Sequence, residues 1–141
     1  MFCQGIYAAI REENNMASKT TIKWLETSEE QDYIAAASYL SLIYDSKTAA
    51  KLSRKLKKAP VSEFKAKDIF RASGLSLLGV SNFHVEKERK KILAGLSLSP
   101  LLLVRDQANG KVVIADGYHR MCSVYGFDEY AVIPCKIVNG R

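Results

Sequence analysis

The residues best suited to chemistry lie in the stretch Ile114–Arg120, which reads IADGYHR. Its apolar start predicts a strand, and Asp116 and Gly117 then lead directly into a predicted helix. The first backbone N–H groups of such a helix have no intrahelical partners, which makes the helix start a general site for an anion. Gly117 would let a ligand come close to the backbone, and His119 and Arg120 would stand in the first helical turn. This pattern predicts a phosphate-binding loop.

The same residues also fit a purely structural arrangement. Asp116 is an ordinary helix cap, Gly117 is an ordinary turn residue, and the spacing of Asp116 and Arg120 favours an i, i+4 ion pair. Charged His119 and Arg120 would each cost roughly 0.3–1 kcal/mol at the positive end of the helix, which a bound phosphate would offset. The residues alone leave both interpretations open.

Two helices are expected ahead of this stretch. Ser28 opens the first as a capping-box residue, and an apolar stripe of helical spacing carries that helix to about Tyr44. Asp45 caps the second helix, at about residues 46–58, and Pro60 ends it. The two helices predict a helical hairpin that packs on the rest of the protein.

The remaining chain predicts a main domain at residues 61–141, of α+β class with a small mixed sheet. The hairpin would occupy residues 16–60, and residues 1–15 form a poorly specified extension. Pro134 places the last strand at a sheet edge or marks its end. The strands are expected at 61–64, 101–104, 112–115 and 131–138, and the helices at 67–73, 82–94 and 116–125.

Length, composition and charge limit the classes of protein to which this chain can belong. The 141 residues suit one domain, and no apolar run approaches the ~20 residues that a membrane-spanning helix needs. Residues 1–10 lack the features of a secretory signal, so a cytoplasmic protein without a membrane partner is expected. Cys3, Cys122 and Cys135 are widely spaced and odd in number, which predicts reduced thiols and no metal site. The net charge of +6 favours anionic partners.

The second predicted helix carries the clearest basic cluster, formed by Lys47, Lys51, Arg54, Lys55, Lys57 and Lys58. Such a face could follow the phosphates of a nucleic acid. It is also an ordinary solvated helix face, because no aromatic or base-reading residue interrupts the lysines. A nucleic-acid-associated module with weak DNA binding is therefore one alternative function, and a non-catalytic partner-binding protein is another.

Residues 61–138 resemble the ParB/sulfiredoxin family. The resemblance rests on the segment GLSLSPLLLV at 95–104, on DGYHR at 116–120 between a strand and a helix, and on the closing segment IPCKIV. The family places a nucleotide phosphate, or a related phosphate group, at the start of the helix that follows the motif. The resemblance therefore implies that phosphate or nucleotide is bound by Gly117, Tyr118, His119 and Arg120.

Differences within the family bear on the expected activity. Sulfiredoxins carry a nucleophilic cysteine directly before the His-Arg pair, where this chain has Tyr118, so repair of a peroxiredoxin sulfinic acid is not expected. Chromosome-partitioning ParB proteins read GERR at this place. The free-serine kinases, with DGHHR, are the most similar branch, and they imply phosphoryl transfer with ATP or ADP and magnesium.

Two carboxylates are candidates for the general base or for metal coordination in such a reaction. Asp116 is the first and Glu63, on the first strand of the main domain, is the second. Glu63 also fits an exposed position on an edge strand. His84 could contact a ligand from the preceding loop, although a lone histidine near a helix start more often caps the helix or faces solvent.

Overall fold

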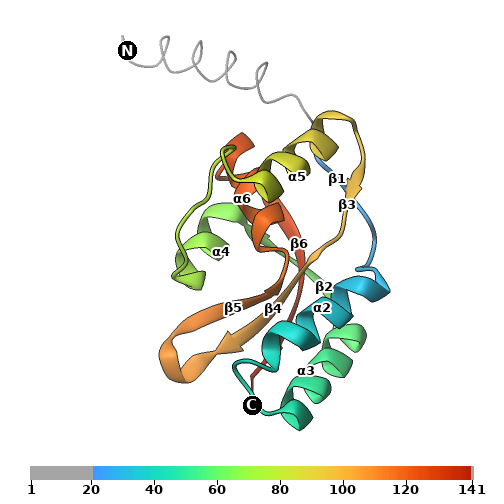
Figure 1. The fold of residues 1–141 in the computed structure, drawn as a ribbon, viewed down its shortest axis with the longest axis vertical. Helices are drawn as coiled ribbons and strands as arrows, with labels where there is room; N and C mark the ends of the chain where they lie inside the picture. Colours follow the sequence, from blue (N-terminus) through green and yellow to red (C-terminus); the bar gives the residue numbers. More distant parts are fainter. Residues whose placement is uncertain (1–20, 141) are drawn as a thin grey trace, which may run out of the picture.

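The computed structural model describes residues 21–140, so the expected extension at residues 1–15 lies outside the described residues. In this part of the chain no helix has the length and apolar character needed to cross a bilayer. The elements in chain order (Figure 1) are β1 (Lys23–Trp24), α2 (Glu30–Leu40), α3 (Ser46–Lys58), β2 (Val61–Lys65), α4 (Ala66–Ser73), α5 (Phe83–Leu93), β3 (Ser97–Leu98), β4 (Leu101–Asp106), the 3₁₀ turn η1 (Gln107–Asn109), β5 (Lys111–Asp116), α6 (Tyr118–Phe127) and β6 (Val132–Asn139).

The larger sheet has four strands in the order β2-β6-β4-β5. β4 and β6 are parallel, and the other two neighbouring pairs are antiparallel. The short strands β1 and β3 form a separate parallel pair. The sheet is therefore small and mixed, and the α+β class predicted from the sequence is confirmed.

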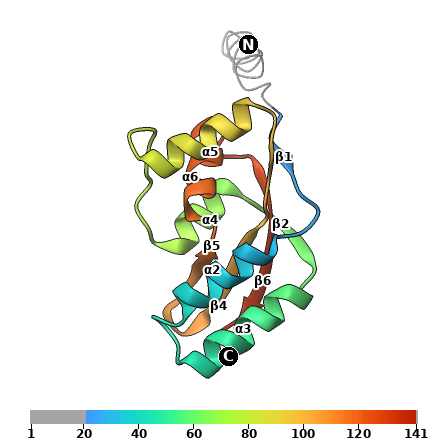
Figure 2. The same cartoon turned by 45° about the vertical axis from the view of Figure 1, so that its right-hand side comes forward.

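Helices cover both faces of this sheet (Figures 1 and 2). α2 and α3 pack on one face, and α4, α5 and α6 pack on the other. Successive residues of β4 alternate between the two cores: Leu101 and Leu103 face the α6 side, while Leu102 and Val104 face the hairpin side. Because both faces of the strand are buried, its sequence is continuously apolar rather than alternating.

The residue that caps the start of α2, the first helix of the hairpin, differs from the prediction. Ser28 does not cap α2; its hydroxyl is buried and donates a hydrogen bond to the Pro100 carbonyl oxygen at 3.2 Å. Glu29 is the N-cap instead, and Asp32 completes the capping box. α2 ends at Leu40, four residues earlier than the sequence pattern predicts. The boundaries of α3 agree with the prediction.

Two expectations at the C-terminal side are wrong. β6 is a central strand and not an edge, because it lies between β2 and β4. Pro134 is tolerated there because the pairing of β6 with β4 begins only at Cys135. α6 continues through Gly126 to Phe127, since the glycine lies in helical backbone and does not terminate the helix.

Candidate functional site

The predicted loop joins β5 to α6 through a single residue, Gly117. Gly117 is the N-cap of α6 with φ 107°, and no side chain of the described residues caps this helix. A Cβ built on Gly117 would lie 2.7 Å from Leu101 Cγ and 3.0 Å from Arg120 Nη2. The glycine is thus required by its left-handed backbone and by packing within the chain itself. The guanidinium of Arg120 lies against the start of the helix.

Asp116 does not cap α6 and instead pairs with Arg120. The carboxylate accepts a hydrogen bond from Arg120 Nη2 at 2.8 Å, and the two side chains are only 16% and 13% exposed. The ion pair predicted by the i, i+4 spacing therefore forms. Arg120 Nε is buried and has no hydrogen-bond partner among the described residues. A buried donor without a partner costs about 1–3 kcal/mol, so this nitrogen favours an additional acceptor.

A second carboxylate, Asp32 of α2, approaches Asp116 from the hairpin. Asp32 is buried, and its Oδ2 accepts the Glu29 backbone N–H at 2.8 Å. Burial raises the pKa of Asp116, Arg120 opposes that rise, and Asp32 adds to it. Asp32 was not predicted from the sequence as a site residue, because an acidic residue in the first turn of a helix is already explained by capping of that helix.

Two histidines bring the starts of α5 and α6 together. The His84 and His119 ring centroids are 4.8 Å apart, and each residue lies in the first turn of its helix. Asn82 caps α5 by accepting from the His84 and Val85 backbone N–H groups at 3.0 and 3.2 Å. The two positive helix ends therefore point toward one region of the molecule.

The surroundings of His119 favour its neutral form. Burial lowers the pKa of His119 and the neighbouring His84 lowers it further, while Glu88 of α5 opposes both. The ring of Tyr118 is 5.3 Å from that of His119, and its hydroxyl donates a hydrogen bond to the Ser76 carbonyl oxygen. Tyr118 thereby ties the segment between α4 and α5 to the start of α6.

The second candidate carboxylate does not join this group. Glu63 is exposed on β2, and β2 and β5 form opposite edges of the four-stranded sheet. At about 4.8 Å per strand spacing, three spacings separate the two strands by roughly 14 Å. The structure thus brings Asp116, Gly117, Tyr118, His119 and Arg120 together and adds Asp32 and His84, while Glu63 lies elsewhere.

The two cysteines of the described residues are free and buried. Burial raises the pKa of Cys122, which lies one helical turn after Tyr118, and raises the pKa of Cys135 to about 12. A nucleophilic cysteine acts as the thiolate, so a raised pKa is unfavourable for that role. Cys3 lies outside the described residues.

Within residues 21–140, no group of three or more His, Cys, Asp or Glu side chains is arranged to hold a metal ion. Comparisons with protein-family models, with curated proteins and with solved structures find no match to this chain.

Proposed function

We propose that the converging starts of α5 and α6 bind the phosphate group of a small molecule, in the manner of the ParB/sulfiredoxin family that the sequence resembles. The observation that carries this proposal is the approach of His84 and His119 to 4.8 Å, with the Arg120 guanidinium against the start of α6. The uncapped backbone N–H groups of α6, the ring N–H groups of the two histidines and Arg120 Nε are all donors, and a phosphate oxygen is an acceptor for each.

The local charges set the expected strength of binding. Each helix start contributes about +0.5 elementary charge, but the charge of Arg120 is compensated by Asp116 at 2.8 Å. Asp32 and Glu88 add negative charge nearby. We therefore expect modest affinity for phosphate that increases when His119 becomes protonated, at a pH below its usual pKa of 6.5.

Phosphoryl transfer from a nucleotide to a small hydroxyl compound is the reaction class proposed for this site. Asp116 would accept the hydroxyl proton while the acceptor oxygen bonds to the γ-phosphorus, the bond to the β-phosphate oxygen breaks, and ADP leaves. The raised pKa of Asp116 makes it a stronger base than an ordinary carboxylate.

Magnesium enters this proposal with the nucleotide, since Mg²⁺ is usually bound by one or two carboxylates together with substrate phosphates. Asp32 of α2 fits this role, because it lies close to Asp116, which is left free to act as the base. A cytoplasmic location, also proposed, would supply nucleotide and keep the buried thiols reduced.

Thermal-shift and calorimetric titrations with ATP, ADP, CTP, phosphate and sulfate, with and without magnesium, test the proposal. A ligand that binds only the folded chain stabilises it by about 2.7 kcal/mol at one hundred times its Kd, which gives a clear rise in Tm. Arg120→Ala should weaken binding at least tenfold, about 1.4 kcal/mol, and Arg120→Lys should restore it only in part. Arg71→Ala, an exposed arginine on α4, is the matched control.

Because Arg120→Ala leaves Asp116 without its partner, the variant can unfold for structural reasons. His119→Gln avoids this difficulty, since no salt bridge involves His119 within residues 21–140. We expect His119→Gln to fold and to weaken binding. The proposal is wrong if none of the five ligands changes the Tm of the wild-type chain, or if binding is equal in wild type and His119→Gln.

A further inference from the structure

The whole excess of positive charge in this protein is carried by α3. The helix contains six of the 21 Lys and Arg residues and no acidic residue. The rest of the chain has fifteen basic and fifteen acidic side chains, so it contributes no net charge. A chain that is neutral outside one helix of thirteen residues presents a localised positive surface and not a diffuse one.

Five of the six basic residues of α3 form one stripe on its outer side. At 100° per residue, an arc of about 100° contains Lys47, Lys51, Arg54, Lys55 and Lys58. The buried residues Ala49, Leu52 and Leu56 lie on the opposite side, against the sheet. With a rise of 1.5 Å per residue the stripe is about 16 Å long. Figure 2 shows α3 along the outside of the molecule, and the five residues of the stripe are exposed.

Interactions within the protein stabilise only some of the basic side chains of α3. Of the six basic side chains, only Lys57 forms a salt bridge within residues 21–140, to Glu30 at 2.7 Å. Lys55, Lys57 and Lys58 lie in the last turn, where cations interact favourably with the helix dipole. Lys47, Lys51 and Arg54 have neither a partner nor this benefit. These three exposed side chains are hydrated, and their charges are available to an anionic partner.

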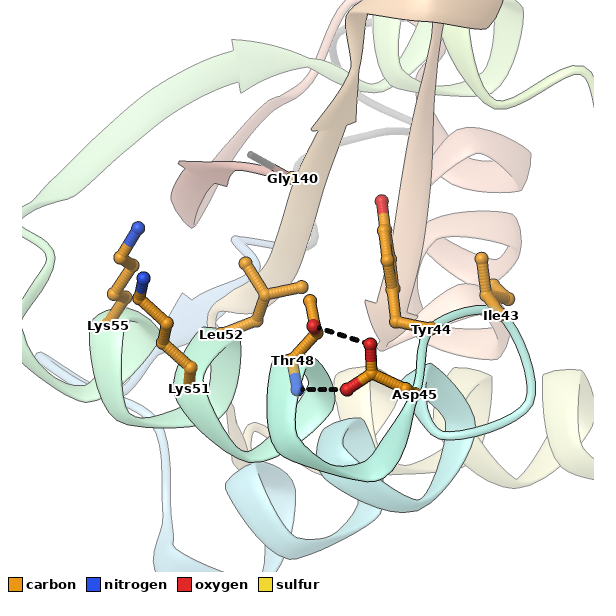
Figure 3. A pocket seen from close by; sticks show the side chains of 8 residues that line it. All are labelled: Ile43, Tyr44, Asp45, Thr48, Lys51, Leu52, Lys55 and Gly140. Atoms are coloured by element: carbon orange, nitrogen blue, oxygen red, sulfur yellow. Dashed lines mark hydrogen bonds between the residues drawn. The ribbon is translucent and has the colours of Figure 1, made fainter.

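A concave surface adjoins the stripe. Lys51 and Lys55 extend side by side along the wall of a cavity of about 510 Å³, whose lining also includes Ile43, Tyr44 and Gly140 (Figure 3). A second cavity of about 520 Å³ shares the latter three residues and adds Arg105 and the η1 turn. The charge of Arg105 is offset there by the adjacent Asp106, so the positive surface remains that of α3.

We propose that α3 binds double-stranded DNA through the backbone phosphates, without reading the base sequence. A helix of this size fits the major groove, and a stripe of cations along it matches a line of phosphates. The exposed side of α3 offers no Asn or Gln to read adenine edges, and its one arginine, Arg54, is the single forked donor available for guanine. An anionic membrane fits less well, because a membrane-surface helix needs an exposed apolar face and α3 buries its own against the sheet. This proposal is independent of the phosphate site at α6.

Fluorescence anisotropy with a labelled 20-base-pair duplex, titrated with the full chain between 50 and 200 mM salt, tests the proposal. We expect binding that weakens steeply with salt and is the same for unrelated sequences. Replacing Lys47, Lys51 and Lys55 by Gln removes three phosphate contacts, so the log–log slope should flatten by about 2.7 units. Over this fourfold change in salt, the variant should lose roughly 40-fold less affinity than the wild type.

The matched control replaces three exposed lysines outside α3, Lys65, Lys87 and Lys111, by Gln. Both triple variants carry the same net charge, so an effect of overall charge alone would appear equally in the two. We expect the control to keep the wild-type slope, and circular dichroism and Tm to show that both variants fold. Equal slopes in the two triple variants would overturn the proposal. So would a wild-type chain that binds vesicles of anionic lipid but not the duplex at 50 mM salt.

Discussion

Replacing Gly117 by alanine tests the geometry from which the α6 site is built. The new Cβ would lie 2.7 Å from Leu101 Cγ and 3.0 Å from Arg120 Nη2. Leu101 is 0% exposed in the central strand β4 and cannot move aside without disturbing the core. The left-handed backbone at φ 107° adds roughly 1–2 kcal/mol for an L-residue, and overpacking adds about 1–3 kcal/mol. We therefore expect Gly117→Ala to lower the free energy of unfolding by about 2–5 kcal/mol.

Two other glycines separate these contributions. Gly74 has φ 67° but nothing within 4 Å of an added Cβ, so Gly74→Ala should show only the backbone cost of roughly 1–2 kcal/mol. Gly126 lies in helical backbone of α6 with open space around it, so Gly126→Ala should stabilise by about 0.5–1 kcal/mol. Equilibrium urea denaturation at pH 7 measures all three variants on one scale.

The order of the three variants decides the outcome. Gly117→Ala should be the least stable, Gly74→Ala intermediate, and Gly126→Ala more stable than the wild type. If Gly117→Ala is no less stable than Gly74→Ala, the contact with Leu101 does not constrain the loop. The position of Gly117, and with it the packing of Arg120 against the helix start, would then be wrong.

Three further predictions concern the side chains around this loop. Because burial lowers the pKa of His119 below its usual 6.5, the neutral ring is favoured in the folded state. The wild type should therefore lose unfolding free energy relative to His119→Gln as the pH falls below 6.5, and a constant difference in urea denaturation between pH 7 and 5 would contradict this. Asp32→Asn should lower the pKa of Asp116, as followed by carboxyl ¹³C NMR, while the Asn side chain still caps α2; an unchanged titration would show that the two carboxylates do not interact. The chain should not repair a peroxiredoxin sulfinic acid with ATP, because Tyr118 provides no thiolate; repair that disappears in Cys122→Ser would instead identify Cys122 as the nucleophile.

Features set within one helix or turn could be read from the sequence. Asp45 accepts the Thr48 backbone N–H at 2.8 Å, and Pro60 comes directly after the C-cap residue Ala59 of α3, so both ends of that helix are determined by neighbouring residues. The Asp116 to Arg120 pair is also local, because Asp116 directly precedes the N-cap of α6 and Arg120 lies in its first turn. The run Leu101–Val104 indicates a strand buried on both faces.

Local sequence patterns failed to predict the structure where a hydrogen bond or a strand pairing forms with a group far away in the chain. Ser28 has the sequence context of a helix cap, but the Pro100 carbonyl oxygen, far away in the chain, takes its hydroxyl. Pro134 suggested an edge strand or the end of a strand, yet β6 lies between β2 and β4, and its pairing with β4 begins one residue after the proline. Both outcomes depend on the order of the strands, which no short stretch of sequence contains.

The composition of the candidate site was decided by the same tertiary packing. Spacing alone brings Asp116, Gly117, His119 and Arg120 together, since they belong to one strand-to-helix junction. Asp32 reaches them only because α2 packs on β5, and His84 only because α5 packs on α6. Glu63 is excluded because β2 and β5 occupy opposite edges of the sheet. A sequence determines which residues meet within a helical turn, whereas contacts between separate elements depend on how their apolar faces are buried against one another.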